Sequence, residues 1–357
     1  MPDLECFINS LQYAIETCSE YDIIPHVDGD SHKLLYVCED SFGICNCITK
    51  FMFDKYEIEL ISNDLLNCLL LIAPNTTTFW NYKRHALQNN KLSTSSELKF
   101  TQLILNKCPR SYETLFHRSQ WIVQHYNYFN DDTFLQHELE LCNKFADKYR
   151  CNYGLWQYRR FLLMHLHKRE LYEMELNLID IWLEKHPTDT SGWSYLEYFL
   201  DGLVNQSITV GELSPTLDDQ SGLKSSTKIV VQNYFKKLHS ILELYPERES
   251  VWLFRRRLII LWLQLNQHRL PCSYIDESII ESLNPVEPLL SQVLDIITKL
   301  KSSDNMYHIN FSFNEFLNWA YKNKICHEPS TLKWIDLLSL RYLFWLSEYL
   351  TGSSKIE

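Results

Sequence analysis

Basic side chains recur at regular places along this chain of 357 residues. Such cations either pair with carboxylates of a neighbouring element or bind an anionic ligand such as phosphate. Leu196 and Glu197 interrupt the series at its fourth place, which favours local pairing over a continuous anion-binding stripe. We therefore expect most of these cations to pair with acids of an adjacent helical hairpin, while a binding face remains the alternative. The basic residues are Lys83, Arg84, Arg118, Arg159, Arg160, Arg255 and Arg256.

These basic residues lie three or four positions after one point of a phrase that occurs five times. We call that point the zero position; it is occupied by Trp80, Leu115, Trp156, Trp193 and Trp252. A proline stands six residues before it in four copies, and Arg150 takes that place in the third. An aliphatic residue follows seven residues after it, on the same face of a helix, whereas the proline ends any preceding helix. Each copy therefore predicts helix, break, helix, with the zero position at the start of the second helix.

The zero positions are 35, 41, 37 and 59 residues apart, which is typical of stacked helical hairpins. The pattern predicts an all-α array of hairpins over residues 61–272, with a flexible insert at 201–227. Residues 1–60 should form an N-terminal helix and an irregular extension that could hold a small hairpin. Residues 273–357 read as capping helices.

The composition of the chain argues against several classes of function. The net charge of −11 argues against a general nucleic-acid binder. The sequence shows neither a signal peptide nor an apolar run long enough to span a membrane. Eleven cysteines, an odd number, read as reduced and mostly buried, and Cys45 and Cys47 have no second pair to complete a zinc site. These features favour a cytoplasmic protein without a metal of its own.

The phrase resembles the repeat of protein prenyltransferase alpha subunits. CPRSYETLFHRSQWIV and ELELCNKFADKYRCNYGLWQYRRFLL look like consecutive repeats of the Rab geranylgeranyltransferase alpha subunit. The resemblance covers about residues 60–270, and the N-terminal extension and late insert look more like the protein prenyltransferase alpha subunit repeat-containing proteins.

The resemblance implies a right-handed superhelix of hairpins that wraps around a beta subunit, which we expect to be of the Rab geranylgeranyltransferase type. In that family the beta subunit carries the zinc and the isoprenoid diphosphate, and the protein substrate offers a C-terminal cysteine. The chain alone is then expected to be inactive. The same resemblance implies a role in the subunit interface or in a ladder between repeats for Trp80, Arg84, His117, Arg118, Asn152, Trp156, Arg159, Arg160, Trp193, Trp252, Arg255 and Arg256.

One family residue bears on catalysis, a lysine five residues before the aromatic. Arg110 stands at the matching place, and Tyr112 and Tyr153 match the tyrosine that follows in two copies. The resemblance therefore implies that Tyr112 and Tyr153 bind the substrate. An arginine could stabilise the charge of a leaving diphosphate but could not donate a proton. Cys151 and Gly154 depart from the family pattern in the third copy. The alternative, which carries equal weight, is that Arg110 is an ordinary solvated residue with no role in catalysis.

The function predicted from the sequence is therefore the alpha subunit of a heterodimeric protein geranylgeranyltransferase, a transferase. The alternative is a helical-repeat scaffold for protein interactions without prenylation activity.

Overall fold

The computed structural model describes residues 4–25, 33–48, 62–89, 92–123, 131–166, 169–205, 217–267, 277–302 and 312–351. Its residues divide into two compact units, Met1–Leu166 with Glu170–Glu175, and His167–Arg169 with Leu176–Glu357. We describe each unit by itself.

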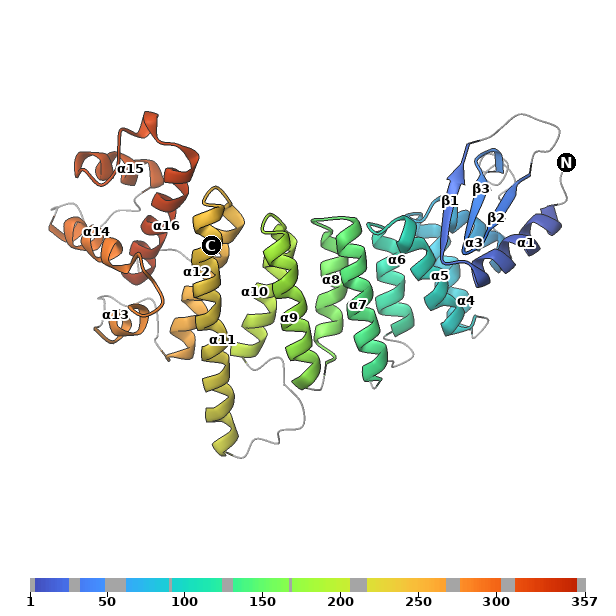
Figure 1. Cartoon of the computed structure of the whole chain (residues 1–357), viewed down its shortest axis with the longest axis horizontal. Coiled ribbons are helices and arrows are strands. Elements are labelled where there is room, and N and C mark those ends of the chain that lie inside the picture. The colour runs from blue at the N-terminus through green and yellow to red at the C-terminus, as the bar shows by residue number, and fades with distance from the viewer. Residues whose placement is uncertain are drawn as a thin grey trace. The chain divides into compact units, whose positions relative to one another are not determined.

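Helical hairpins build most of the first unit (Figure 1). In each hairpin a short turn joins a first helix to a second; the turn contains a proline in the first two hairpins and Arg150 in the third. The three hairpins are α3 (Asn63–Ile72) with α4 (Thr77–Gln88), α5 (Thr94–Lys107) with α6 (Tyr112–Phe116), and α7 (Asp132–Lys148) with α8 (Tyr153–Leu163). Helix α6 continues directly into a π-helical segment, His117–Val123.

The second unit repeats this plan and ends in further helices. Helix α9 (Arg169–Lys185), whose first residues belong partly to the first unit, precedes α10 (Thr190–Val204). Helix α11 (Leu217–Leu244) then pairs with α12 (Glu249–Leu265). The closing elements are α13 (Glu277–Leu283), α14 (Leu290–Ser302), α15 (Phe313–Lys322), a 3₁₀ turn at Pro329–Thr331 and α16 (Trp334–Thr351).

All five zero positions are the fourth residue of a second helix, in α4, α6, α8, α10 and α12. Each side chain is buried, from fully for Trp80 to 7% exposed for Trp252. The predicted all-α hairpin repeat is therefore confirmed, and its register was correct in every copy. The right-handed superhelical course of the array remains a prediction.

The N-terminal segment contains more regular structure than the sequence indicated. Helix α1 (Leu4–Thr17) leads into strand β1 (Glu20–Ile24), and β2 (Leu35–Cys38) and β3 (Ser41–Cys45) form an antiparallel hairpin. Strand β1 pairs with β3 in parallel, so the order is β1-β3-β2. The small hairpin was expected, but the added parallel strand was not, because its partner lies about twenty residues away along the chain.

The N-terminal segment shares one core with the first hairpins. Leu11, Tyr21 and Phe42 belong to the same buried cluster as Leu70 and Phe100. The hydroxyl of Tyr21 donates to the carbonyl of Leu71 at 2.9 Å, which ties β1 to the end of α3. Residues 4–48 are therefore part of the first unit rather than a separate extension, while residues 49–60 lie outside the described part of the chain.

The predicted insert at 201–227 is helical at both ends. Its first residues, Asp201–Val204, complete α10, and residues 217–227 belong to α11. Residues 206–216 lie outside the described residues. The predicted helices after residue 273 are present, and α16 packs against α12 and α14. Within the described residues, no helix is both long and apolar enough to cross a membrane.

Candidate functional site: the inter-repeat ion pairs and the Arg110 surface

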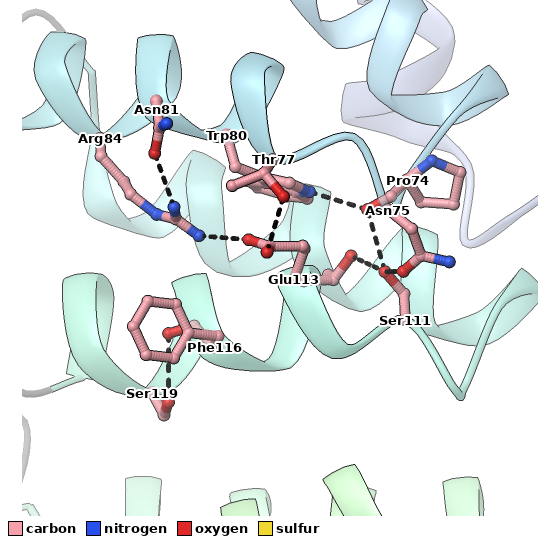
Figure 2. Close-up of polar contacts among 11 residues, drawn as sticks. Pro74, Asn75, Thr77, Trp80, Asn81, Arg84, Ser111, Glu113, Phe116 and Ser119 are labelled. Carbon is pink, nitrogen blue, oxygen red and sulfur yellow. Dashed lines mark hydrogen bonds and ion pairs between the residues drawn. The ribbon is translucent and has the colours of Figure 1, made fainter.

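In three of the five copies the tryptophan at the zero position fixes the turn before the second helix. The indole Nε1 of Trp80 donates to the carbonyl of Pro74 at 2.8 Å (Figure 2). Trp193 and Trp252 make the same bond to Pro187 and Pro246, each at 2.9 Å. A buried indole N–H requires an acceptor, and the carbonyl of the proline in the turn requires a donor, so the bond satisfies both. The constant spacing of six residues thus has a direct structural cause.

In two copies the residue four before the zero position links one hairpin turn to the previous one. Ser111 precedes α6, and its hydroxyl contacts the carbonyl of Pro74 at 3.0 Å (Figure 2). Asn152 precedes α8 and donates from Nδ2 to the carbonyl of Pro109 at 2.6 Å, while its Oδ1 accepts from the N–H of Leu155. Asn152 therefore both caps its own helix and holds the adjacent turn, which is a role between repeats of the kind expected for it.

The cation three residues after the zero position is buried in four of the five copies. Lys83, Arg118, Arg159 and Arg255 are each at most 4% exposed. Each contacts a buried glutamate that follows its own hairpin in sequence; three of the glutamates lie on helices, and Glu287 lies between α13 and α14. The pairs are Lys83–Glu97 at 2.6 Å, Arg118–Glu138 at 2.5 Å, Arg159–Glu175 at 2.6 Å and Arg255–Glu287 at 2.7 Å. The expected pairing with acids of the adjacent hairpin is confirmed for this position, and we call these four contacts the ladder.

The acids of the ladder were missed by the sequence analysis, although they have a regular signature. Glu97, Glu138 and Glu175 stand 18 residues before Leu115, Trp156 and Trp193. In the fourth copy the cation is replaced by Leu196, and the residue 18 before Trp252 is Tyr234 instead of a glutamate. Cation and acid are therefore lost together, as expected when neither can be buried without the other.

Aromatic hydroxyls complete two of the ladder contacts. Tyr158 donates to Oε2 of Glu138 at 2.5 Å, and Tyr342 of α16 donates to Oε2 of Glu287 at 2.5 Å. Burial alone would raise the pKa of Glu138 and lower that of Arg118. The charge of each partner outweighs burial, so the pKa of Glu138 is lowered to about 2 and that of Arg118 is raised. Both groups are therefore charged at neutral pH.

The first ladder contact has a different composition, with lysine in place of arginine and histidine in place of tyrosine. His117 is fully buried, and its Nε2 lies 3.4 Å from Oε2 of Glu97. Its ring packs on Trp80 at a centroid distance of 4.7 Å. Burial lowers the pKa of His117, opposed by Glu97 and reinforced by the charges of Lys83 and Arg84. His117 therefore belongs to the ladder as a neutral side chain.

Three copies carry a cation four residues after the zero position, Arg84, Arg160 and Arg256. Arg84 donates to Oε2 of Glu113 at 2.8 Å and lies over the ring of Phe116, joining α4 to α6 (Figure 2). Arg256 donates to the carbonyl of Arg341 and lies over Trp345. Arg160 is half-buried near the end of α8. These residues contribute individual contacts and do not extend the ladder.

Arg110 lies on the surface, in the turn between α5 and α6. Its Nη1 donates to the hydroxyl of Tyr149 at 2.9 Å, and its guanidinium carbon lies 4.6 Å from the centre of that ring. Tyr112 and Tyr153, the other predicted substrate-contacting residues, are 57% and 65% exposed. A Cβ added at Gly154 would lie 3.4 Å from Leu115 and 3.6 Å from Tyr112, so α8 begins close against α6. We call Arg110, Tyr112, Tyr149 and Tyr153 the Arg110 surface.

Tyr149 was not among the predicted residues. The sequence offers one signal for it, a tyrosine seven residues before the zero position. The structure shows that this side chain is exposed, so packing at the end of the helix does not require so large a residue. The ten described cysteines are free, and no group of three potential metal ligands occurs among the described residues.

A stack of helical hairpins with a proline turn and a buried cation–glutamate contact between neighbours defines an all-α helical-repeat protein. Residues 135–166 and 172–203 both match the family model of the protein prenyltransferase alpha subunit repeat. The chain therefore carries this repeat, and the resemblance inferred from the phrase is confirmed.

Relatives of two kinds are similar to the chain. Protein prenyltransferase alpha subunit repeat-containing protein 1 of Danio rerio is 27% identical over 234 residues, which cover 56% of this chain and 55% of that protein. Its counterpart in Homo sapiens is 26% identical over 240 residues, 57% of this chain and 60% of that protein. Geranylgeranyl transferase type-2 subunit alpha of Mus musculus is 25% identical over 237 residues, 62% of this chain and 38% of that protein. The chain spans about half the length of the first relatives and less of the last.

The first prediction concerns the ladder. Arg159→Leu should lower the free energy of unfolding by about 3 to 5 kcal/mol, because Glu175 is left buried without its partner. The double variant Arg159→Leu/Glu175→Tyr copies the pair that the fourth copy carries at 196 and 234. It should be more stable than Arg159→Leu, as measured by urea unfolding. A double variant as unstable as the sum of its two single variants would show that the pair acts through something other than mutual charge compensation.

The second prediction concerns pH. Because burial lowers the pKa of His117 below that of an unfolded histidine, about 6.5, the unfolded chain binds more protons than the folded one below that pH. The free energy of unfolding should therefore fall between pH 7 and pH 5.5, by up to about 1.4 kcal/mol per pH unit. His117→Phe, which copies Phe254 at the same repeat position, should reduce this slope.

The control for this measurement is His239→Gln, a change at an exposed histidine of α11. The pKa of Glu97 is also lowered, since Lys83 and His117 outweigh burial, but its contribution is lost only below about pH 4.5 and outside the window. An unchanged slope in His117→Phe would mean that other groups cause the acid sensitivity.

Proposed function

We propose that this chain is the alpha subunit of a heterodimeric protein prenyltransferase that transfers a geranylgeranyl group from its diphosphate to a cysteine of a protein substrate. The proposal rests above all on the paired repeat matches at 135–166 and 172–203. It is supported by the similarity of 237 residues to proteins named geranylgeranyl transferase type-2 subunit alpha. In this proposal a beta subunit of the Rab type carries the zinc and the isoprenoid, and the complex works in the cytoplasm.

The ladder supports a scaffold role for the repeats within that enzyme. Its cations are buried and form ion pairs with glutamates, so they are not available to bind substrate. The residues free to meet a partner or a substrate are exposed at the turns and helix starts, and the Arg110 surface is such a place. We propose that Arg110 stabilises the negative charge of the leaving diphosphate, a role that requires a fixed positive charge and no proton transfer.

The third prediction tests the partnership. Co-expression with a prenyltransferase beta subunit of the Rab type should yield a one-to-one complex. The chain expressed alone should be poorly soluble, because it would expose its half of an obligate interface that buries about 2,000 Å² or more. The measurement is co-purification followed by light scattering. A chain that is a stable monomer and ignores each beta subunit would favour the alternative, an interaction scaffold without prenylation activity.

The fourth prediction tests Arg110 in that complex. Arg110→Ala should leave complex formation intact and slow transfer about 10- to 100-fold, or about 1.4 to 2.7 kcal/mol of transition-state stabilisation. Arg110→Lys should restore most of the rate, because the charge is kept. Single-turnover kinetics is the appropriate measurement, since product release can limit the steady state.

Tyr112→Phe is the nearby control and should matter less, because the exposed ring of Tyr112 stacks on Phe116 and the change keeps that ring. A single-turnover rate in Arg110→Ala equal to that of the wild type would remove Arg110 from the reaction.

A further inference from the structure

The contact between Arg110 and Tyr149 joins two successive turns of the repeat. Tyr149 accepts a hydrogen bond from Nη1 at 2.9 Å and places its ring 4.6 Å below the guanidinium carbon. We propose that Tyr149 is a positioning residue, which holds Arg110 in the orientation that meets the diphosphate of the isoprenoid substrate. This inference rests on the function proposed above and adds a residue to it.

The contact is not a feature of the repeat. Arg110 stands five residues before its zero position, where the other copies have Asn75, Cys151, Thr188 and Glu247. Tyr149 stands seven before the next zero position, and the corresponding residue in the preceding turn is Cys108. An arginine followed in the next copy by this tyrosine occurs once in the five copies. The ladder contacts recur from copy to copy, whereas the contact between Arg110 and Tyr149 is made once, so the repeat itself does not require it.

The turn that carries Arg110 is held on both sides. The carbonyl of Pro109, next to Arg110, accepts from Nδ2 of Asn152 at 2.6 Å. On the other side, the N–H of Ser111 donates to the carbonyl of Cys108 at 3.0 Å. The backbone of Arg110 is therefore fixed, and the orientation of its long side chain is left to Tyr149. An arginine on a fixed backbone and an aromatic ring loses little freedom when it binds an anion.

Tyr149 is itself well placed to act as a support. It ends α7, where its N–H donates to the carbonyl of Phe145 at 3.2 Å. The preceding residue, Lys148, donates to the carbonyl of Asn106 at 2.9 Å and so ties the end of α7 to the end of α5. The same turn also departs from the other copies, because Arg150 replaces the proline and Cys151 has a positive φ of 53°. The chain thus changes its regular turn at the place where Tyr149 must reach Arg110.

The charge of Arg110 remains available to a ligand. In the part of the chain that the structure describes, no carboxylate forms an ion pair with it. A guanidinium has five N–H groups, and the bond to Tyr149 uses one, which leaves donors for two phosphate oxygens. A ring beneath the guanidinium orients the cation without neutralising it, unlike the glutamates of the ladder. This arrangement suits a diphosphate, whose oxygens accept bidentate bonds.

The fifth prediction tests Tyr149 in the complex with the beta subunit. Tyr149→Leu should slow single-turnover transfer about 10-fold, and Tyr149→Phe, which keeps the ring, about 2- to 3-fold. The double variant Arg110→Ala/Tyr149→Leu should be no slower than Arg110→Ala, because Tyr149 acts only through Arg110. The thermal midpoint of each complex should stay within a few degrees of the wild type, which separates positioning from folding.

The matched control is Tyr245→Leu, since Tyr245 holds the same repeat position in the last copy and is 39% exposed. Among the described residues its side chain contacts no arginine side chain, and only its backbone carbonyl accepts from the N–H of Arg248. This variant should transfer at the wild-type rate. A slow Arg110→Ala together with a normal Tyr149→Leu would overturn the role of Tyr149 and leave the proposed function intact. Additive losses in the double variant would also overturn it. A wild-type complex that transfers no isoprenoid would overturn the proposed function, and the positioning role with it.

Discussion

The stacking of this chain depends on the rule that a buried charge must be paired. Each ladder cation belongs to one hairpin, and its glutamate belongs to an element that follows it. A guanidinium buried to 1% exposure, as in Arg159, would be strongly destabilising without a carboxylate. A pair of this kind adds little net stability over apolar residues, but it penalises any arrangement in which the two hairpins slip or separate. The ladder therefore fixes which hairpin follows which, and at what register.

The fourth copy lacks a ladder contact and is joined to the next hairpin by other interactions. Leu196 and Tyr234 replace the cation and the acid, and the interval to the next zero position lengthens to 59 residues. Tyr234 is satisfied differently, by Asp180 at 2.5 Å. Arg257 of α12 meanwhile pairs with Asp201 and Glu197 of α10, a contact between second helices that resembles Arg84–Glu113 in the first copies. A half-exposed pair tolerates a longer insertion better than a buried one, because water can satisfy either partner alone.

The contrast between the buried ladder residues and the exposed residues of the turns has a consequence for function. The ladder cations are buried and paired, so they do not form a binding face. Residues that depart from the repeat pattern are therefore the better candidates for a functional role. Arg110, Tyr149 and Arg150 are such residues, and they lie on two successive turns. Their exposure and the uncompensated charge of Arg110 contrast with the satisfied interior of the ladder. Function in a repeat protein is added where the structural requirement is weakest, at turns whose side chains face water.

The sequence by itself determined the elements and their register. The zero-position residue, with a proline six residues before it in four copies and an aliphatic residue seven after it in all five, predicted every second helix correctly, because these spacings reflect bonds and faces within one hairpin. The cations were also identified from the sequence, and so was their pairing with a neighbouring hairpin. These are local consequences of helix geometry.

Only the tertiary structure decided which partner each side chain meets. Glu97, Glu138 and Glu175 stand among many acids, and their shared spacing acquires meaning only when the hairpins are stacked. The parallel strand β1 and the support of Arg110 by Tyr149 likewise join residues that are far apart in sequence. Periodicity reports the face on which a residue lies, whereas the contact it makes depends on how that face packs against the next element, and this is set by the whole fold.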